Sequence, residues 1–490
     1  MKDITRMSAA ALAKQLACKE VSAKEAAEAY LARIEETDGS VGAYLSVASG
    51  HALKTAEAID QKRKNKEALS PLAGVPVALK DNMCTTWGHT TCASKMLSNF
   101  RSPYTATAVQ KLTEAGCVFL GKANMDEFAM GSSTENSAVK VTKNPRDLAC
   151  VPGGSSGGAA AAVAADEAAF ALGSDTGGSI RQPAAFCGVV GMKPTYGRVS
   201  RYGLIAFASS LDQIGPLTKT VEDCALVLDA ICGYDPQDST SVPGKETGFR
   251  KALTGEVRGR RLALPREFLG EGVSSGVKAA ILEAAKRFEA MGAEVAEVSM
   301  PMLSNALPAY YIISSAEASS NLGRFDGVRY GYRAEGSETL EELYLKSRSE
   351  GFGPEVKRRI LLGTFALSAG YYDAYYKKAL QVRTLLSEAY AKVFETFDAI
   401  LSPVAPTAAY RIGEKTADPL EMYLGDICTV PVNIAGLPGL SMPCGEAEGL
   451  PVGMQLVGRA FDEYTLLNFG AAYEREYGAY HLAAPAFGRD

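Results

Sequence analysis

Histidine is nearly absent from this sequence, with three residues among 490. His51 is predicted to open a helix, His89 lies in a predicted loop, and His481 lies near the C-terminus. None of them stands beside a motif that would carry a nucleophile. A Ser-His-Asp triad or a histidine-rich metal site would have to draw on these three residues. The sequence therefore argues against histidine-based catalysis, and we predict no metal site in the chain.

Long apolar runs, basic blocks and paired cysteine motifs are also absent. No apolar run reaches the ~18 residues of a membrane-spanning helix, and the N-terminus lacks the apolar core of a secretory signal. The ten cysteines form no Cys-x-x-Cys pair and lie in apolar stretches such as AAFCGVVGM, where a thiol behaves as a small hydrophobic side chain. The net charge of −5 does not favour a nucleic-acid-binding surface. We therefore expect a cytoplasmic protein with reduced cysteines and no membrane segment.

Short apolar runs alternate with amphipathic helical segments along most of the chain. The first 65 residues are predicted to be helical, with Ser22 and Glu25 spaced as a capping box. Runs such as VPVALK and CVFLGK then alternate with helical segments such as ATAVQKLTEAG, and residues 305–395 are predicted to be mainly helical. This alternation predicts a buried, mostly parallel or mixed sheet covered by helices. No linker divides the chain, so we expect residues 1–490 to form one domain.

Two clusters of small residues stand out, GGSSGG at 153–158 and GSDTGGS at 173–179. A flexible linker would be flanked by polar, low-complexity sequence, but GGSSGG is followed by an alanine-rich helical stretch. A phosphate-binding loop would need G-x-x-x-x-G-K-[ST] or G-x-G-x-x-G, and neither pattern occurs at the two clusters. The sequence therefore favours a loop that enters a helix N-terminus, with glycines that permit close approach of the backbone.

The run D-T-G-G-S ends in a serine that could be a nucleophile. The N–H groups of Thr176, Gly177 and Gly178, with that of Ser179, could form an oxyanion hole, because glycine leaves room for an acyl oxygen. A serine hydroxyl needs a base, and a lysine with a lowered pKa is the alternative to histidine. Lys80 ends the strand-like run GVPVALK. A lysine at a strand end is more often a surface charge, so the residues alone leave both interpretations open.

The segments GVPVALKDN, GGSSGG and GSDTGGSIRQPAAFCGVVGMKPTYGRVS resemble the motifs of the amidase signature family, and the similarity extends over nearly the whole chain. It implies an α/β fold with a single large mixed β-sheet covered by helices on both faces, and a signature core at 70–220. It implies that Ser179 is the nucleophile, Lys80 the base, and Ser155 a bridging serine held by a cis Ser–Ser peptide bond. Lys80 would take a proton from Ser155, which would take one from Ser179.

Further segments, including NMDEFAMGSSTENSA and DICTVPVNIAGLPGLSMPCG, resemble the A subunits of the glutamyl-tRNA(Gln) amidotransferases within that family. The similarity implies that glutamine is bound by Tyr310, Arg359 and Asp426. Arg359 would hold the α-carboxylate in its planar fork, and Asp426 would hold the α-ammonium. Tyr311 and Arg358 adjoin two of these positions and are their alternatives.

Three flanking features are expected to support the site. Asp175 and Arg181 are predicted to brace the nucleophile loop rather than to react, and residues 130–133 are expected to line the glutamine site.

The implied function is glutamine hydrolysis that supplies ammonia to a partner. A B subunit would use ATP and Mg²⁺ to activate the glutamate carried by misacylated Glu-tRNA(Gln), which it would also bind, and a small C subunit would complete a heterotrimer. This chain itself would need no cofactor. Two alternatives remain: a stand-alone amidase for a small amide, which would not need Arg359 and Asp426, and a non-catalytic scaffold subunit.

Overall fold

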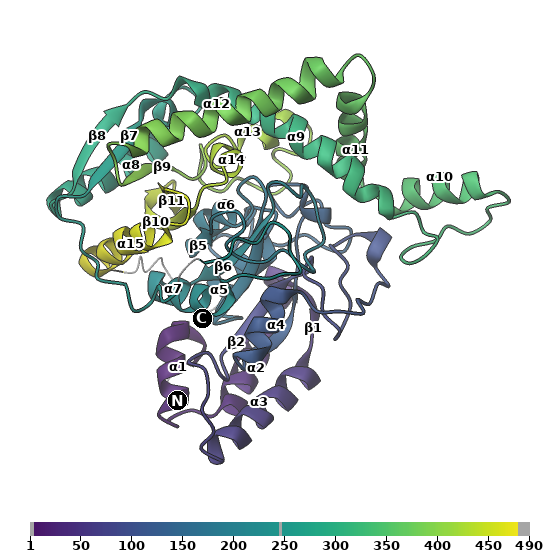
Figure 1. Cartoon of the computed structure of the whole chain (residues 1–490). Helices are drawn as coiled ribbons and strands as arrows, with labels where there is room; N and C mark the ends of the chain where they lie inside the picture. The colour runs from purple at the N-terminus through teal and green to yellow at the C-terminus, as the bar shows by residue number, and fades with distance from the viewer. Residues whose placement is uncertain (1–3, 245–246, 479–490) are drawn as a thin grey trace.

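Eleven strands form one sheet among the residues that the structure, a computed structural model, describes, 4–244 and 247–478 (Figure 1). In order across the sheet they are β1 (Tyr44–Val47), β3 (Val118–Ala123), β2 (Pro76–Lys80), β4 (Phe170–Asp175), β6 (Gln213–Thr218), β5 (Val190–Lys193), β10 (Gly439–Ala447), β11 (Leu450–Gly458), β9 (Ala399–Pro403), β7 (Arg261–Pro265) and β8 (Glu294–Val298). β3, β2 and β4 run parallel, as do β9, β7 and β8, and antiparallel pairs join these two groups. The predicted mixed sheet is therefore confirmed.

Helices cover both faces of this sheet (Figure 1). The described residues contain α1 (Ala9–Ala17), α2 (Ala23–Val41), α3 (Ser49–Lys64), α4 (Thr107–Glu114), α5 (Gly157–Ala164), α6 (Arg181–Cys187), α7 (Val221–Ile231), α8 (Ser275–Ala290), α9 (Ala306–Asn321), α10 (Leu340–Gly351), α11 (Pro354–Leu367), α12 (Lys377–Phe394), α13 (Pro419–Leu424), α14 (Val430–Ile434) and α15 (Glu463–Tyr477). Within that part of the chain, none of these helices is long and apolar enough to cross a membrane. All ten cysteines are free thiols, and nine of them are buried.

The N-terminal segment differs from its prediction at one place. Ser22 and Glu25 form the predicted capping box at the start of α2, but the first 65 residues also contain the strand β1. β1 is one of the two edge strands of the sheet and pairs antiparallel with β3. A strand of four residues gains its stability from pairing with its neighbour, so its sequence alone carries little signal.

The GGSSGG loop leads directly into α5, as predicted. Every residue of α5 is buried, and the helix consists of alanines, glycines and one valine. Helix α5 contacts β2, β4 and α6. Because small side chains allow close contact, the helix can lie against the sheet while its preceding loop reaches the ends of β2 and β4. This arrangement brings the three signature segments together.

Helices α9, α11 and α12 form a separate layer at one end of the molecule, while α1 to α3 lie at the opposite end (Figure 1). Helix α9 packs against both α11 and α12, which agrees with the helical character predicted for 305–395. Gly363 permits the close approach of α11 to α9, since a Cβ at that residue would stand 1.8 Å from the carbonyl oxygen of Ser315. This packing sets α9 and α11 side by side at the edge of the catalytic loops.

Candidate active site

Lys80 is the last residue of β2, and its side chain is fully buried. Its Nζ donates to Ser155 Oγ at 2.7 Å, to Ser156 Oγ at 2.9 Å and to the Ser174 carbonyl at 3.2 Å. Burial lowers the pKa of Lys80 to about 7, although nearby carboxylates, Asp126 foremost, act to raise it. Near neutral pH a large share of the amine is therefore unprotonated. This excludes the surface-charge interpretation and provides a group that can accept a proton.

The loop that carries Ser155 contains a cis peptide bond between Gly154 and Ser155. The cis bond was predicted between Ser155 and Ser156, and the structure places it at the preceding peptide bond. A Cβ on Gly154 would stand 2.1 Å from Asp126 Oδ2 and 2.6 Å from the Ser133 nitrogen, so glycine is required before Ser155. Ser156 instead continues into α5, and its hydroxyl joins Ser155 in contacting the Lys80 amine.

Ser179 lies on the loop that joins β4 to α6. It keeps 8% of its surface exposed, whereas Ser155 and Lys80 keep none. The two serine loops meet through the main chain, since the Ser156 N–H donates to the Ser179 carbonyl at 3.1 Å. Among the hydrogen bonds of the described residues, none joins the hydroxyls of Ser155 and Ser179, so that relay step stays a prediction. Of the three residues, Ser179 is the one that substrate can reach.

The nucleophile loop curls around the Asp175 carboxylate. Asp175 accepts the N–H of Gly178 at 2.8 Å and the N–H of Ile180 at 3.1 Å. The Gly178 N–H is therefore engaged within the loop, which departs from its predicted oxyanion role. The N–H groups of Thr176, Gly177 and Ser179 have no hydrogen-bond acceptor among the described residues, so three of the four predicted donors remain for an oxyanion.

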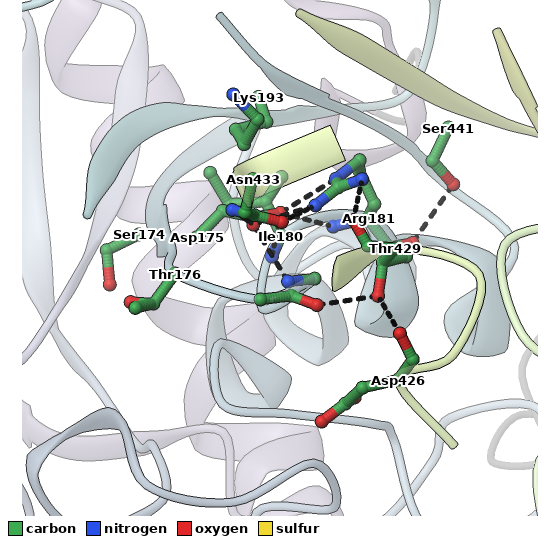
Figure 2. Close-up of polar contacts among 12 residues, drawn as sticks. Ser174, Asp175, Thr176, Ile180, Arg181, Lys193, Asp426, Thr429, Asn433 and Ser441 are labelled. Atoms are coloured by element: carbon green, nitrogen blue, oxygen red, sulfur yellow. Dashed lines mark hydrogen bonds and ion pairs between the residues drawn. The ribbon is translucent and has the colours of Figure 1, made fainter. Parts of the chain in front are cut away.

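Arg181 lies beside Asp175 and anchors this loop (Figure 2). It is completely buried and pairs with Asp175 through Nη2 and Oδ1 at 3.0 Å. It also donates to the Thr429 carbonyl at 3.1 Å and to the Asn433 side chain. Burial acts to raise the pKa of Asp175, but the Arg181 charge outweighs it and holds that pKa below its ordinary value. These contacts agree with the bracing roles predicted for Asp175 and Arg181.

Arg359 projects from α11 and is buried, while the side chain of Arg358 remains 41% exposed. Arg359 Nε donates to Glu355 Oε1 at 2.6 Å, and Tyr423 donates to the same oxygen at 2.8 Å. The guanidinium lies 4.6 Å from the centre of the Tyr311 ring and 4.7 Å from that of Tyr423. Its Nη1 is buried without a partner among the described residues. Because buried donors are rarely left unpaired, this group is suited to a substrate carboxylate.

Asp426 supplies the opposite charge near the same aromatic cluster. Its carboxylate accepts the Ser132 hydroxyl at 2.8 Å and the Tyr311 hydroxyl at 3.1 Å. Burial raises the pKa of Asp426 to about 7, and the two hydroxyl groups oppose that rise. Ser132 belongs to the 130–133 loop, which therefore lies against Asp426. Tyr311 touches both charged residues, because its hydroxyl reaches Asp426 and its ring packs against Arg359.

Tyr310 reaches the catalytic loop, and its ring packs edge-on against Tyr311 of the aromatic cluster with centroids 5.0 Å apart. The side chain is buried on α9, and its hydroxyl lies 2.6 Å from the position that a Cβ on Gly177 would occupy. The two neighbouring tyrosines therefore serve different parts of the site, Tyr310 beside the nucleophile loop and Tyr311 between the charged residues.

The sequence model of the Amidase family matches residues 25–467. This chain belongs to the amidase family. It is 58% identical over 470 residues to the A subunit of the glutamyl-tRNA(Gln) amidotransferase of Moorella thermoacetica, a match that covers 96% of each chain. The crystal structure of the corresponding protein from Thermotoga maritima is 42% identical, with a TM-score of 0.80 and coverage of 97% of this chain and 96% of that one. Native peptide amidase from Stenotrophomonas maltophilia is 30% identical, with a TM-score of 0.82 and 99% coverage of both chains.

The histidines of this amidase lie elsewhere. His51 stacks on Trp87 at 4.9 Å, and His89 accepts a hydrogen bond from Arg101 at 3.3 Å. His481 lies outside the described residues. Within the described ranges, no three His, Cys, Asp or Glu side chains gather where they could hold a metal ion.

The structure also reveals supporting residues of this amidase that the motifs did not single out. Ser156 holds the Lys80 amine together with Ser155, and its adjacency to Ser155 was the only signal. Glu355 fixes Arg359, and their spacing of four residues on one helix could have indicated it. No comparable signal linked Tyr423 to this pair, because the two segments meet only in the folded chain.

Proposed function

We propose that this chain is the glutaminase subunit of a glutamyl-tRNA(Gln) amidotransferase, which hydrolyses glutamine and supplies ammonia for the conversion of Glu-tRNA(Gln) to Gln-tRNA(Gln). The observation that carries the proposal is the combination of a buried lysine–serine pair with an unpaired buried arginine donor on a neighbouring helix. The names of the relatives described above support the same assignment.

The proposed reaction begins at the Lys80 amine. Its neutral form accepts the Ser155 proton, Ser155 accepts the Ser179 proton, and Ser179 Oγ attacks the side-chain amide carbon of glutamine. The N–H groups of Thr176, Gly177 and Ser179 stabilise the oxyanion. The same relay in reverse protonates the leaving nitrogen, so ammonia departs and a glutamyl ester remains on Ser179. Water then attacks the ester by the same route and releases glutamate.

Recognition of the amino acid is assigned to the residues around the aromatic cluster. Arg359 binds the α-carboxylate through its unpaired Nη1, and Asp426 binds the α-ammonium. Tyr310 contacts the substrate between these charges and the nucleophile loop. Binding of a cation favours the charged form of Asp426, because an opposite charge at close range lowers the pKa of a carboxyl group.

The ammonia is expected to pass to a partner B subunit in the cytoplasm. There ATP and Mg²⁺ would activate the glutamyl γ-carboxylate on the misacylated tRNA, which that subunit would bind. A C subunit would complete the heterotrimer. No step within this chain uses these cofactors.

The substitution Ser179→Ala tests this proposal in the assembled amidotransferase. It should abolish glutaminase activity and glutamine-dependent formation of Gln-tRNA(Gln), since the nucleophile is lost. Amidation with ammonium chloride as nitrogen donor should remain, because ammonia bypasses the glutaminase site. Unchanged glutamine-dependent amidation would refute catalysis by this chain and favour the scaffold alternative.

Substrate choice separates the proposal from a stand-alone amidase. Similar folds occur in peptide amidase and in a bacterial aryl acylamidase, which is 26% identical with a TM-score of 0.86. The purified chain should therefore be assayed on glutamine, a C-terminal peptide amide and an aryl acylamide. Efficient turnover of the latter two without partner subunits would overturn the amidotransferase assignment.

A further inference from the structure

Thr429 lies between the two halves of the site. It is fully buried immediately before α14, and Figure 2 shows it between Arg181 and Asp426. Its hydroxyl lies 2.6 Å from the carbonyl oxygen of Gly177 and 3.2 Å from that of Asp426. One side chain therefore contacts both the nucleophile loop and the segment that carries Asp426.

The peptide unit between Gly177 and Gly178 is held at both ends. Its carbonyl oxygen accepts the Thr429 hydroxyl, and its N–H donates to Asp175 Oδ1 at 2.8 Å. A peptide unit is planar, so two opposed hydrogen bonds fix its rotation. That rotation fixes ψ of Gly177 and φ of Gly178, and so helps to place the flanking N–H groups of Gly177 and Ser179, which are two of the three groups available to an oxyanion.

The main chain of Thr429 is held as firmly as its side chain. Its carbonyl accepts Arg181 Nη1 at 3.1 Å, and its N–H donates to the Asp426 carbonyl at 3.1 Å. The contact with the nucleophile loop is also tight, since a Cβ on Gly178 would stand 2.2 Å from Thr429 Oγ1. Thr429 thus occupies a fixed place from which its hydroxyl can orient the loop.

We propose that Thr429 is a positioning residue for glutamine hydrolysis, which orients the Gly177–Gly178 peptide relative to the segment that carries Asp426. This inference rests on the proposed glutaminase function. Loss of the hydroxyl frees the Gly177 carbonyl and lets the peptide turn, so the flanking oxyanion donors are displaced. Arg359 and the carboxylate of Asp426 keep their own contacts, so glutamine binding changes less than the rate of the chemical step.

The experiment compares Thr429→Val with Thr429→Ser in the assembled amidotransferase. Valine keeps the size of threonine and removes the hydroxyl, whereas serine keeps the hydroxyl and removes the methyl group. We expect kcat for glutamine hydrolysis to fall roughly 10- to 100-fold in the valine variant, with KM within about threefold, because small displacements of catalytic groups cost rates of this order. The serine variant should stay within about threefold of the parent in kcat.

Thr218→Val is the matched control. Thr218 is also fully buried and also donates to a main-chain carbonyl, that of Thr220 at 2.9 Å. It pairs with Phe170 at the end of β4 that is remote from Asp175. This variant should lose thermal stability to a similar degree as Thr429→Val, measured by thermal unfolding, but keep its kcat.

Three outcomes would overturn the inference. They are a kcat in Thr429→Val within twofold of the parent, an equal loss in the valine and serine variants, and a change confined to KM. Ser179→Ala, assayed in parallel, keeps the two proposals distinguishable. If that variant retained glutaminase activity, the proposed function would fail, whereas full loss there with an unaltered Thr429→Val would reject only the role of Thr429.

Discussion

The catalytic loops and the proposed amino-acid site of this amidase are built in different ways. The catalytic loops come from the ends of β2 and β4 and the start of α5, and most of their contacts use main-chain groups and hydroxyls, with Lys80 and the buried Asp175–Arg181 pair as the charged residues. The proposed amino-acid site comes from α9, α11, the 130–133 loop and the segment around Asp426, and its contacts are mostly between aromatic and charged side chains. The first construction fixes atoms through the backbone, whereas the second depends on side chains that neighbours must hold in place.

This difference predicts which substitutions act on kcat and which act on KM. A substitution in the loops should lower kcat and leave KM nearly unchanged, whereas a substitution in the aromatic cluster should raise KM and change kcat little. The four experiments below test that division, beginning with the largest expected effect.

Replacement of Lys80 by methionine should reduce kcat for glutamine hydrolysis by about 10³-fold or more, because it removes the proton acceptor. Methionine fits a buried site without a charge, so the fold should persist. Steady-state glutaminase assays of the complex measure the loss, and ammonia-dependent amidation serves as the control. A kcat within tenfold of the parent would show that another group is the base.

Arg359→Ala should raise KM for glutamine roughly 100-fold, since it leaves the substrate carboxylate without its buried partner. The effect on kcat should be smaller. Arg358→Ala is the matched control, because that side chain is partly exposed and adjacent in sequence; its KM should stay within about twofold. Equal effects of the two substitutions would contradict the assignment of Arg359.

Glu355→Gln should raise KM by about tenfold while kcat changes little. The amide keeps the size of the side chain but no longer offers a carboxylate to Arg359 Nε and the Tyr423 hydroxyl. Titration of glutamine in the glutaminase assay gives both constants. If kcat fell and KM stayed constant, the separation between loops and aromatic cluster would not hold.

A change of pH should have the smallest effect on activity, and it should act on kcat through Lys80 and on KM through Asp426. The pKa of Lys80 is lowered to about 7, and its neutral form reacts, so kcat should rise as pH increases through about 7. The pKa of Asp426 is raised to about 7, and its charged form binds the ammonium group, so KM should fall over the same range.

Asp426→Asn tests this pH assignment. The variant should bind glutamine weakly with a KM that no longer depends on pH near 7, while the pH dependence of kcat persists. Rate measurements from about pH 6 to about pH 8.5 cover both transitions. Persistence of the KM transition would assign it to a group other than Asp426.

The short-range features of the fold were predictable from the sequence. The capping box of α2, the helix after GGSSGG and the strand that ends at Lys80 each depend on neighbouring residues and were confirmed. The edge strand β1 was missed because pairing with β3 stabilises it. That residues 1–490 form a single domain stays a prediction.

The candidate site was predictable where its residues lie in contiguous motifs. Lys80 and Ser155 meet as expected, but the cis bond precedes Ser155, and the Gly178 N–H turns toward Asp175. Both details depend on backbone rotation, which residue types restrict only partly where glycine is present.

The sequence by itself determined the residue types of the catalytic loops, the position of the lysine at a strand end and the scarcity of histidine. Only the tertiary structure decided that Arg359 rather than Arg358 is buried, that Tyr311 joins Asp426 across 115 residues of chain, and that Ser132 reaches Asp426 across 294. It also lowered the pKa of Lys80, since burial is a property of the whole fold. Chain order specifies neighbours within a few residues, whereas these contacts arise because packing brings distant segments together.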